Sequence, residues 1–114
     1  MDIKVSNEDT FHVIAVNGDL DASSSIGLDN ALKHAFVNNE KRILVDCSQL
    51  NYISSAGLGV FMSYLQEFED HHVSIALFGV SSKILDVFQI LGLDQLLTIA
   101  FSKEAAKLSI VNEL

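Results

Sequence analysis

Short apolar runs alternate along the chain with segments in which apolar residues recur every three or four positions. Runs rich in β-branched residues predict strands, and the three-to-four spacing predicts amphipathic helices. The pattern predicts strands at 3–5, 11–16, 42–46, 73–78 and 97–101. It predicts helices at 22–37, 55–69, after the caps Ser81-Ser82, and at 103–111. Gly92 is the expected stop of the third helix, because glycine commonly follows a helix end.

The apolar positions of each predicted helix define the face that should be buried. The third helix is expected to bury Ile84, Val87, Phe88 and Leu91. Strand-helix alternation predicts an α/β domain with a mainly parallel sheet and right-handed crossovers. We therefore expect one domain over residues 1–114, with four to five strands, an antiparallel N-terminal edge strand and about four helices.

Three predicted turns follow the carboxyl ends of strands, at 18–21, 47–54 and 79–82. Asn17-Gly18-Asp19, which leads into the first turn, has turn chemistry and is expected to end the preceding strand. In parallel sheets such turns gather at one edge, where binding sites are usually built. The sequence thus predicts that polar residues far apart in the chain are neighbours, namely Asp19, Asp21, Ser54, Ser55, Ser81 and Ser82.

The charge balance narrows the classes of partner. The 114 residues include 15 acidic and 7 basic side chains, which gives a formal net charge of −8. This balance argues against binding to nucleic acid or to an anionic membrane surface, since both require clustered Lys and Arg. It is compatible with a protein partner that carries a basic patch.

Cys47 is the single cysteine, so no internal disulfide can form. The first residues lack the layout of a signal peptide, and no apolar run approaches the length of a membrane span. We expect a cytoplasmic protein. We expect no cofactor and no metal site, because the adjacent His71 and His72 have no apparent partner ligand.

The start of the second predicted helix is the most informative segment. A serine there can cap free backbone N–H groups, and the plainer interpretation of Ser54 or Ser55 is an N-cap. The same N–H groups and the helix dipole also favour an anion such as a phosphate. Gly57 and Gly59 lower the helix propensity, and we expect their benefit to be room for another backbone or a phosphate.

This segment carries a family resemblance. The run Ile53 to Gly59 resembles the signature of STAS-domain anti-sigma factor antagonists. In that family the serine two positions before the Gly-Leu pair is phosphorylated by the partner anti-sigma factor, which is also a kinase; here that serine is Ser55. The run Asp46 to Leu50 resembles the family's Asp-x-Ser-x-hydrophobic strand end. The run Gly18 to Asp21 resembles its Gly-acidic-Leu-Asp turn, whose last Asp lies beside the phosphosite.

The resemblance implies a STAS fold and a switch that is not an enzyme. The unphosphorylated form would bind an anti-sigma factor with serine kinase activity, a phosphate on Ser55 would weaken the complex, and a serine phosphatase would restore it. Ser54 is the runner-up phosphosite. The predicted partner-binding residues are Asp19, Asp21, Ser54, Ser55, Ala56, Gly57, Leu58, Gly59, Ser81 and Ser82.

One departure from the family leaves an alternative open. Many members carry Asp immediately before the phosphorylated serine, whereas this chain carries Ser54. The alternative is a STAS scaffold without phosphorylation, as a subunit of a transport or signalling complex.

A hydrolase that uses Ser55 is disfavoured, because the G-x-S-x-G elbow is missing and no motif supplies a base. A dinucleotide fingerprint is rejected, because the third glycine after Gly57 and Gly59 is absent.

Overall fold

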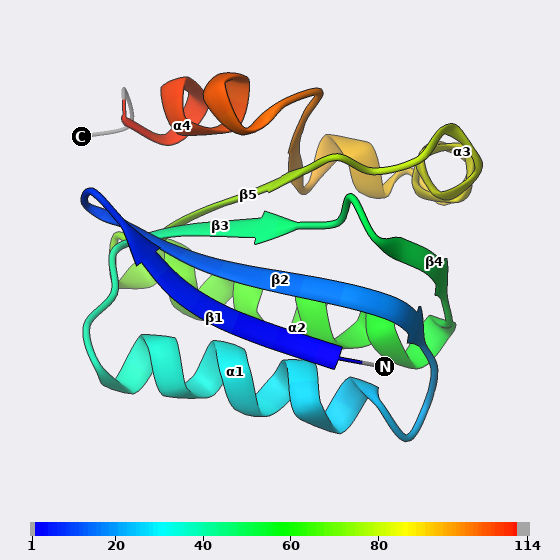
Figure 1. Ribbon diagram of the computed structural model, residues 1–114, viewed down its shortest axis with the longest axis horizontal. Coiled ribbons are helices and arrows are strands. Elements are labelled where there is room, and N and C mark those ends of the chain that lie inside the picture. Colours follow the sequence, from blue (N-terminus) through cyan, green and yellow to red (C-terminus); the bar gives the residue numbers. More distant parts are fainter. Residues whose placement is uncertain (1, 112–114) are drawn as a thin grey trace.

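The computed structural model describes residues 2–111. Along the chain the elements are β1 (Asp2–Glu8), β2 (Phe11–Leu20), α1 (Ser25–Val37), β3 (Arg42–Asp46), β4 (Leu50–Ile53), α2 (Ser55–Asp70), β5 (Ser74–Phe78), α3 (Ser82–Ile90), a 3₁₀ turn (Leu93–Gln95), β6 (Thr98–Ala100) and α4 (Lys103–Val111). Figure 1 shows α1 and α2 on one side of the sheet and α4 on the other. No helix within residues 2–111 is long and apolar enough to cross a membrane.

The sheet follows the order β1-β2-β3-β5-β6, and β4 pairs with β2 outside this path. β1 runs antiparallel to β2, and every other strand pair is parallel. The α/β class with an antiparallel N-terminal edge strand is confirmed. The sheet has six strands, more than the four to five predicted.

The additional strand arises because β2 changes partner. The prediction that β2 ends at Asn17-Gly18-Asp19 was wrong: the strand continues to Leu20. Gly18 takes a φ of 96°, and the pairing register shifts between Gly18 and Asp19. β2 pairs with β4 from Gly18 to Leu20, in the segment predicted to be a turn, and the register shift leaves Asn51 of β4 as the extra residue. Gly18 and Asp19 therefore lie within the strand instead of ending it.

Two apolar clusters cover the two faces of the sheet, as the period-2 alternation of strand side chains requires. In the larger cluster, α1, α2 and α3 pack against the strand residues on the same face of the sheet. These residues of β2, β3 and β5 are Ile14, Val16, Ile43, Val45 and Leu77. The smaller cluster packs α4 against the intervening residues Phe11, Val13, Leu44, Ala76 and Phe78.

The third helix buries less than predicted. Ile84 and Phe88 are in the core, but 37% of Val87 and 57% of Leu91 remain exposed. α3 has only nine residues and ends at Ile90, so a single narrow face meets the sheet. Gly92 follows with a φ of 73°, which confirms it as the left-handed residue that ends this helix.

Candidate phosphoacceptor site

The turns after β2 and β4 lie side by side at the carboxyl edge of the sheet. Leu20 is the register partner of Ile53, and the N–H of Ser54 donates to the carbonyl oxygen of Leu20 at 2.8 Å. Figure 1 shows the start of α1, β4 and the start of α2 together at the right-hand end. The predicted meeting of the Asp21 turn with the two serines is therefore present in the backbone.

Gly57 brings the first turn of α2 directly onto the end of β2. A Cβ atom at this position would lie 2.7 Å from Cδ2 of Leu20 and 3.1 Å from Cγ1 of Ile53. Both neighbouring side chains are buried. Only a glycine permits this separation, so the helix start is fixed relative to the strand end.

Ser54 is the residue that caps α2. Its backbone is extended (φ −88°, ψ 170°), and its hydroxyl oxygen accepts the N–H of Gly57 at 3.2 Å. This is the geometry of an N-cap, in which Ser and Asp are about equally effective. The serine in place of the family's aspartate therefore keeps the cap while removing a carboxylate.

Ser55 is the first helical residue, and its side chain is exposed. Among residues 2–111 its hydroxyl takes part in no hydrogen bond. The helix dipole places positive potential here, and the first turn contains no acidic residue. The N–H groups of Ser55 and Ala56 belong to the first turn, whose donors have no partner within the helix. A hydroxyl at this position is free to accept a phosphate, which the helix start would stabilise.

Asp21 is held within its own turn. Its Oδ1 accepts the N–H of Ser24 at 2.9 Å, and the hydroxyls of Ser24 and Ser23 each donate to the same oxygen at 2.9 Å. These hydrogen bonds, that of the Ser24 N–H foremost, lower the pKa of Asp21 to about 2. The carboxylate thus orders the loop into α1 and stays charged at neutral pH, one residue after the Leu20 carbonyl that accepts the Ser54 N–H.

Tyr52 is an exposed aromatic residue that the sequence did not assign. It lies on β4 as the register partner of Asp19, and 52% of its surface is exposed. Asp19 is exposed as well. The sequence feature that could have identified Tyr52 is the short run with Leu50 and Ile53, which is typical of a strand. This run was interpreted as part of a turn, so Tyr52 was not recognised as a strand residue.

The remaining predicted partner-binding residues have different surroundings. Gly57 and Leu58 are buried, so they shape the helix start and present no side chain to a partner. Ala56 is half-buried, whereas Gly59 is exposed. Ser81 caps α3 by accepting the N–H of Ile84 at 3.3 Å, and Ser82 is exposed.

The turn before α3 lies against the turn after β3. A Cβ on Gly79 would lie 3.0 Å from the backbone nitrogen of Ser48, and the N–H of Cys47 donates to Phe78. Ser81 and Ser82 thus share the carboxyl edge of the sheet with Ser55, but the contacts of their turn are with the β3–β4 turn.

Burial raises the pKa of the Cys47 thiol to about 12, so this thiol stays protonated and inert.

The histidines all lie away from Ser55. His34 is in the last turn of α1, and His71 follows the last residue of α2. His72 is next in the chain. His12 is buried near the start of β2, where Nδ1 lies 3.0 Å from Oδ1 of Asn7. Within residues 2–111 no cluster of His, Cys, Asp or Glu could hold a metal ion.

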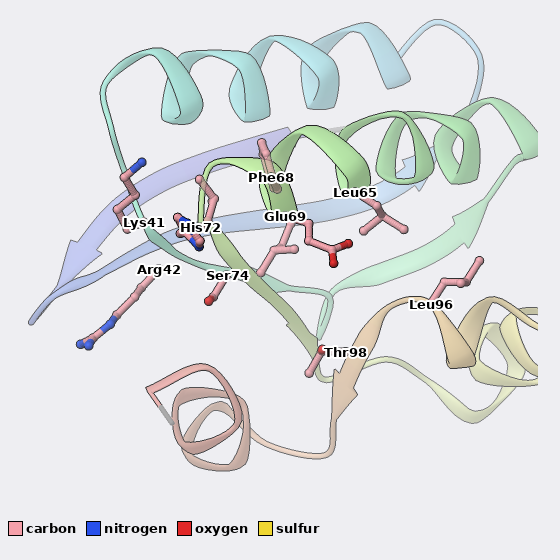
Figure 2. Close-up of a pocket in the computed structure, with 11 residues that line it drawn as sticks. Lys41, Arg42, Leu65, Phe68, Glu69, His72, Ser74, Leu96 and Thr98 are labelled. Carbon is pink, nitrogen blue, oxygen red and sulfur yellow. The ribbon is translucent and has the colours of Figure 1, made fainter. Parts of the chain in front are cut away.

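A groove in the surface also lies away from Ser55. This groove of about 640 Å³ runs between the second half of α2, the starts of β3 and β5, and β6. Figure 2 shows Glu69 pointing into it, while the guanidinium of Arg42 points away. Glu69 lies about 21 Å along α2 from Ser55, at the usual rise of about 1.5 Å per residue. Ser55 does not line this groove and lies at an exposed edge of the fold.

Known proteins share both the sequence pattern and this architecture. The family model described as "Mlab, STAS domain" matches residues 3–98. A protein from Listeria monocytogenes named anti-sigma-B factor antagonist is 30% identical over 98 residues, which cover 85% of this chain and 86% of that protein.

Solved structures agree on the fold. An anti-sigma factor antagonist from Mycobacterium paratuberculosis superposes with a TM-score of 0.85 at 15% identity, covering 97% of this chain and 94% of that one. The Bacillus cell fate determinant SpoIIAA in its phosphorylated form gives 0.72 at 21% identity, covering 95% and 99%. From the family match, the Listeria relative and the shared architecture, the chain belongs to the STAS-domain anti-sigma factor antagonist family.

Proposed function

We propose that this protein is an anti-sigma factor antagonist whose binding to its partner is switched by phosphorylation of Ser55. The observation that carries the proposal is that the two serines at the start of α2 have different surroundings. Ser54 is engaged as the N-cap, while Ser55 next to it offers an exposed hydroxyl without a hydrogen bond among the described residues. Ser55 is thus favoured over Ser54 as the acceptor.

The unphosphorylated surface would bind an anti-sigma factor that is also a serine kinase. The net charge of −8 and the exposed Asp19 and Asp21 suit a partner with a basic patch. Tyr52 adds an exposed aromatic side chain of the kind enriched at interfaces. This chain supplies the acceptor hydroxyl and no catalysis, which fits the distance of every histidine from Ser55.

A phosphate on Ser55 would change the surface more than the fold. It adds a charge of about −1.5 to −2 at neutral pH. The N-terminus of α2 tolerates that charge, whereas a docked partner matched to a neutral hydroxyl would not. The relative SpoIIAA has been solved in both unphosphorylated and phosphorylated forms, which supports a switch that leaves the architecture in place. A separate serine phosphatase would reset the switch, and the proposal implies a cytoplasmic location.

Intact-mass spectrometry tests the proposal. Wild-type protein is incubated with ATP and the protein recovered from native-cell extract on immobilised wild type, alongside Ser55→Ala and Ser54→Ala. We expect one added phosphate in wild type and in Ser54→Ala, and none in Ser55→Ala. An equal gain in Ser55→Ala, or no gain in wild type, refutes Ser55 as the switch. Ser55→Glu should bind the same partner more weakly, and unchanged affinity would contradict the charge mechanism.

The alternative of a STAS scaffold without phosphorylation was motivated by Ser54 in place of Asp. Because Ser54 makes the same cap, that replacement does not disable the site, and the alternative loses its main support. It would be favoured by a partner complex that forms equally well with wild type and with Ser55→Glu.

A further inference from the structure

The outer face of α2 carries no large side chain next to Ser55. Ser55 and Gly59 are both exposed, and they are four residues apart, so they are neighbours on the same face of the helix. A Cβ built on Gly59 would meet no atom within 4 Å, whereas one on Gly57 would collide with Leu20. Packing therefore explains Gly57 but gives no reason for glycine at 59, where alanine would favour the helix.

The direction of helical side chains shows what a residue at 59 would do. Side chains lean toward the helix N-terminus, so each one covers the turn that precedes its own Cα. A side chain at 59 would consequently lie over the turn that carries Ser55, with its Cβ about 5–6 Å from that of Ser55. It would stand beside the Ser55 hydroxyl on the exposed face of the helix.

Ser55 cannot move out to meet a kinase as a residue in a flexible loop can. Gly57 fixes the first turn of α2 against Leu20, and the Ser54 N–H is bonded to the Leu20 carbonyl oxygen at 2.8 Å. Phosphoryl transfer requires the reacting atoms to approach to about 3–3.5 Å. The active site of the kinase must therefore contact the surface of the helix directly.

We propose that Gly59 is a clearance residue: its missing side chain admits the ATP-bearing face of the partner kinase to the Ser55 hydroxyl. The inference rests on the proposed function. In the step that it serves, Oγ of Ser55 forms a bond to the γ-phosphorus of ATP, the bond from that phosphorus to the bridging oxygen breaks, and ADP leaves. The hydroxyl proton passes to a base of the kinase. Gly59 touches none of the reacting atoms and acts by leaving space.

The test compares the initial rate of Ser55 phosphorylation in wild type, Gly59→Ala and Gly59→Leu, with the recovered kinase and ATP. Gly27→Ala is the matched control, because Gly27 is exposed in α1 and a Cβ there makes only an ordinary contact, 3.4 Å from Cδ1 of Ile3. We expect a several-fold slower rate for Gly59→Ala and a loss of about 100-fold for Gly59→Leu. Gly27→Ala should keep the wild-type rate.

Thermal unfolding separates clearance from structural damage. Both variants at 59 should unfold at or above the wild-type temperature, because nothing in the fold is displaced. A Gly59→Leu protein phosphorylated at the wild-type rate overturns the inference while leaving the proposed function intact. An equal slowing in Gly27→Ala also overturns it, since helix stiffening alone would then be the cause. A wild type that gains no phosphate refutes the proposed function and this inference with it.

Discussion

Alanine at Gly57 and alanine at Gly59 should change the free energy of unfolding in opposite directions, although the two positions lie in the same helix. At Gly57 the new Cβ would lie 2.7 Å from Cδ2 and 2.8 Å from Cγ of Leu20, a residue with 0% exposure. Because Leu20 is fully buried, its side chain cannot swing into solvent to make room. At Gly59 the new Cβ would enter open space.

The magnitudes follow from these surroundings. Overpacking a core typically costs about 1–3 kcal/mol, and replacing glycine by alanine within a helix returns up to about 1 kcal/mol. Gly57→Ala should therefore destabilise the protein by about 1–2 kcal/mol. At Gly59 the higher helix propensity of alanine is not offset by overpacking, so Gly59→Ala should stabilise the protein by about 0.5–1 kcal/mol.

Urea unfolding followed by far-ultraviolet circular dichroism measures the difference. With unchanged m-values, the midpoint should fall for Gly57→Ala and rise for Gly59→Ala. In thermal unfolding, 1 kcal/mol corresponds to roughly 4 °C for a chain of this length. A Gly57→Ala protein as stable as wild type would refute the close approach to Leu20. A destabilised Gly59→Ala would show that position 59 is packed.

Three further predictions concern the cap, the Asp21 turn and the core. Ser54→Ala should lose about 1 kcal/mol of stability, whereas Ser54→Asp should stay within about 0.5 kcal/mol of wild type in urea unfolding, because both Ser and Asp cap; equal losses would contradict the cap. Asp21→Asn should be less stable than wild type above the ordinary aspartate pKa of 3.8, and the difference should vanish as pH falls through the folded pKa of about 2, since the native state favours the charged carboxylate. Thermal unfolding from pH 2 to 7 checks this, and a difference independent of pH would speak against it. Phe68→Ala should cost about 3–5 kcal/mol in the same urea assay, because Phe68 is 1% exposed and its ring stacks on Phe36 at 5.7 Å; a loss below 1 kcal/mol would contradict the tight packing.

The sequence determined the features that depend on local pattern. The helical period placed α2 and α4 almost to the residue, and Arg42–Asp46 was found as a buried strand because its apolar run is continuous. The sequence also indicated that the Asp21 turn and the serines of α2 would meet, since the carboxyl ends of parallel strands share an edge. The family resemblance pointed to Ser55 from the same few residues.

Only the tertiary structure decided the features that depend on partners distant in the chain. Asn17-Gly18-Asp19 has the local chemistry of a turn, yet β2 continues through it because β4 supplies new hydrogen bonds. Likewise, the propensity of serine for an N-cap fits Ser54 and Ser55 equally well. The bond from the Ser54 N–H to Leu20 sets where the helix begins, and so makes Ser54 the cap and Ser55 the free hydroxyl. Gly57 and Gly59 are also alike in sequence, and they differ because only one of them faces Leu20.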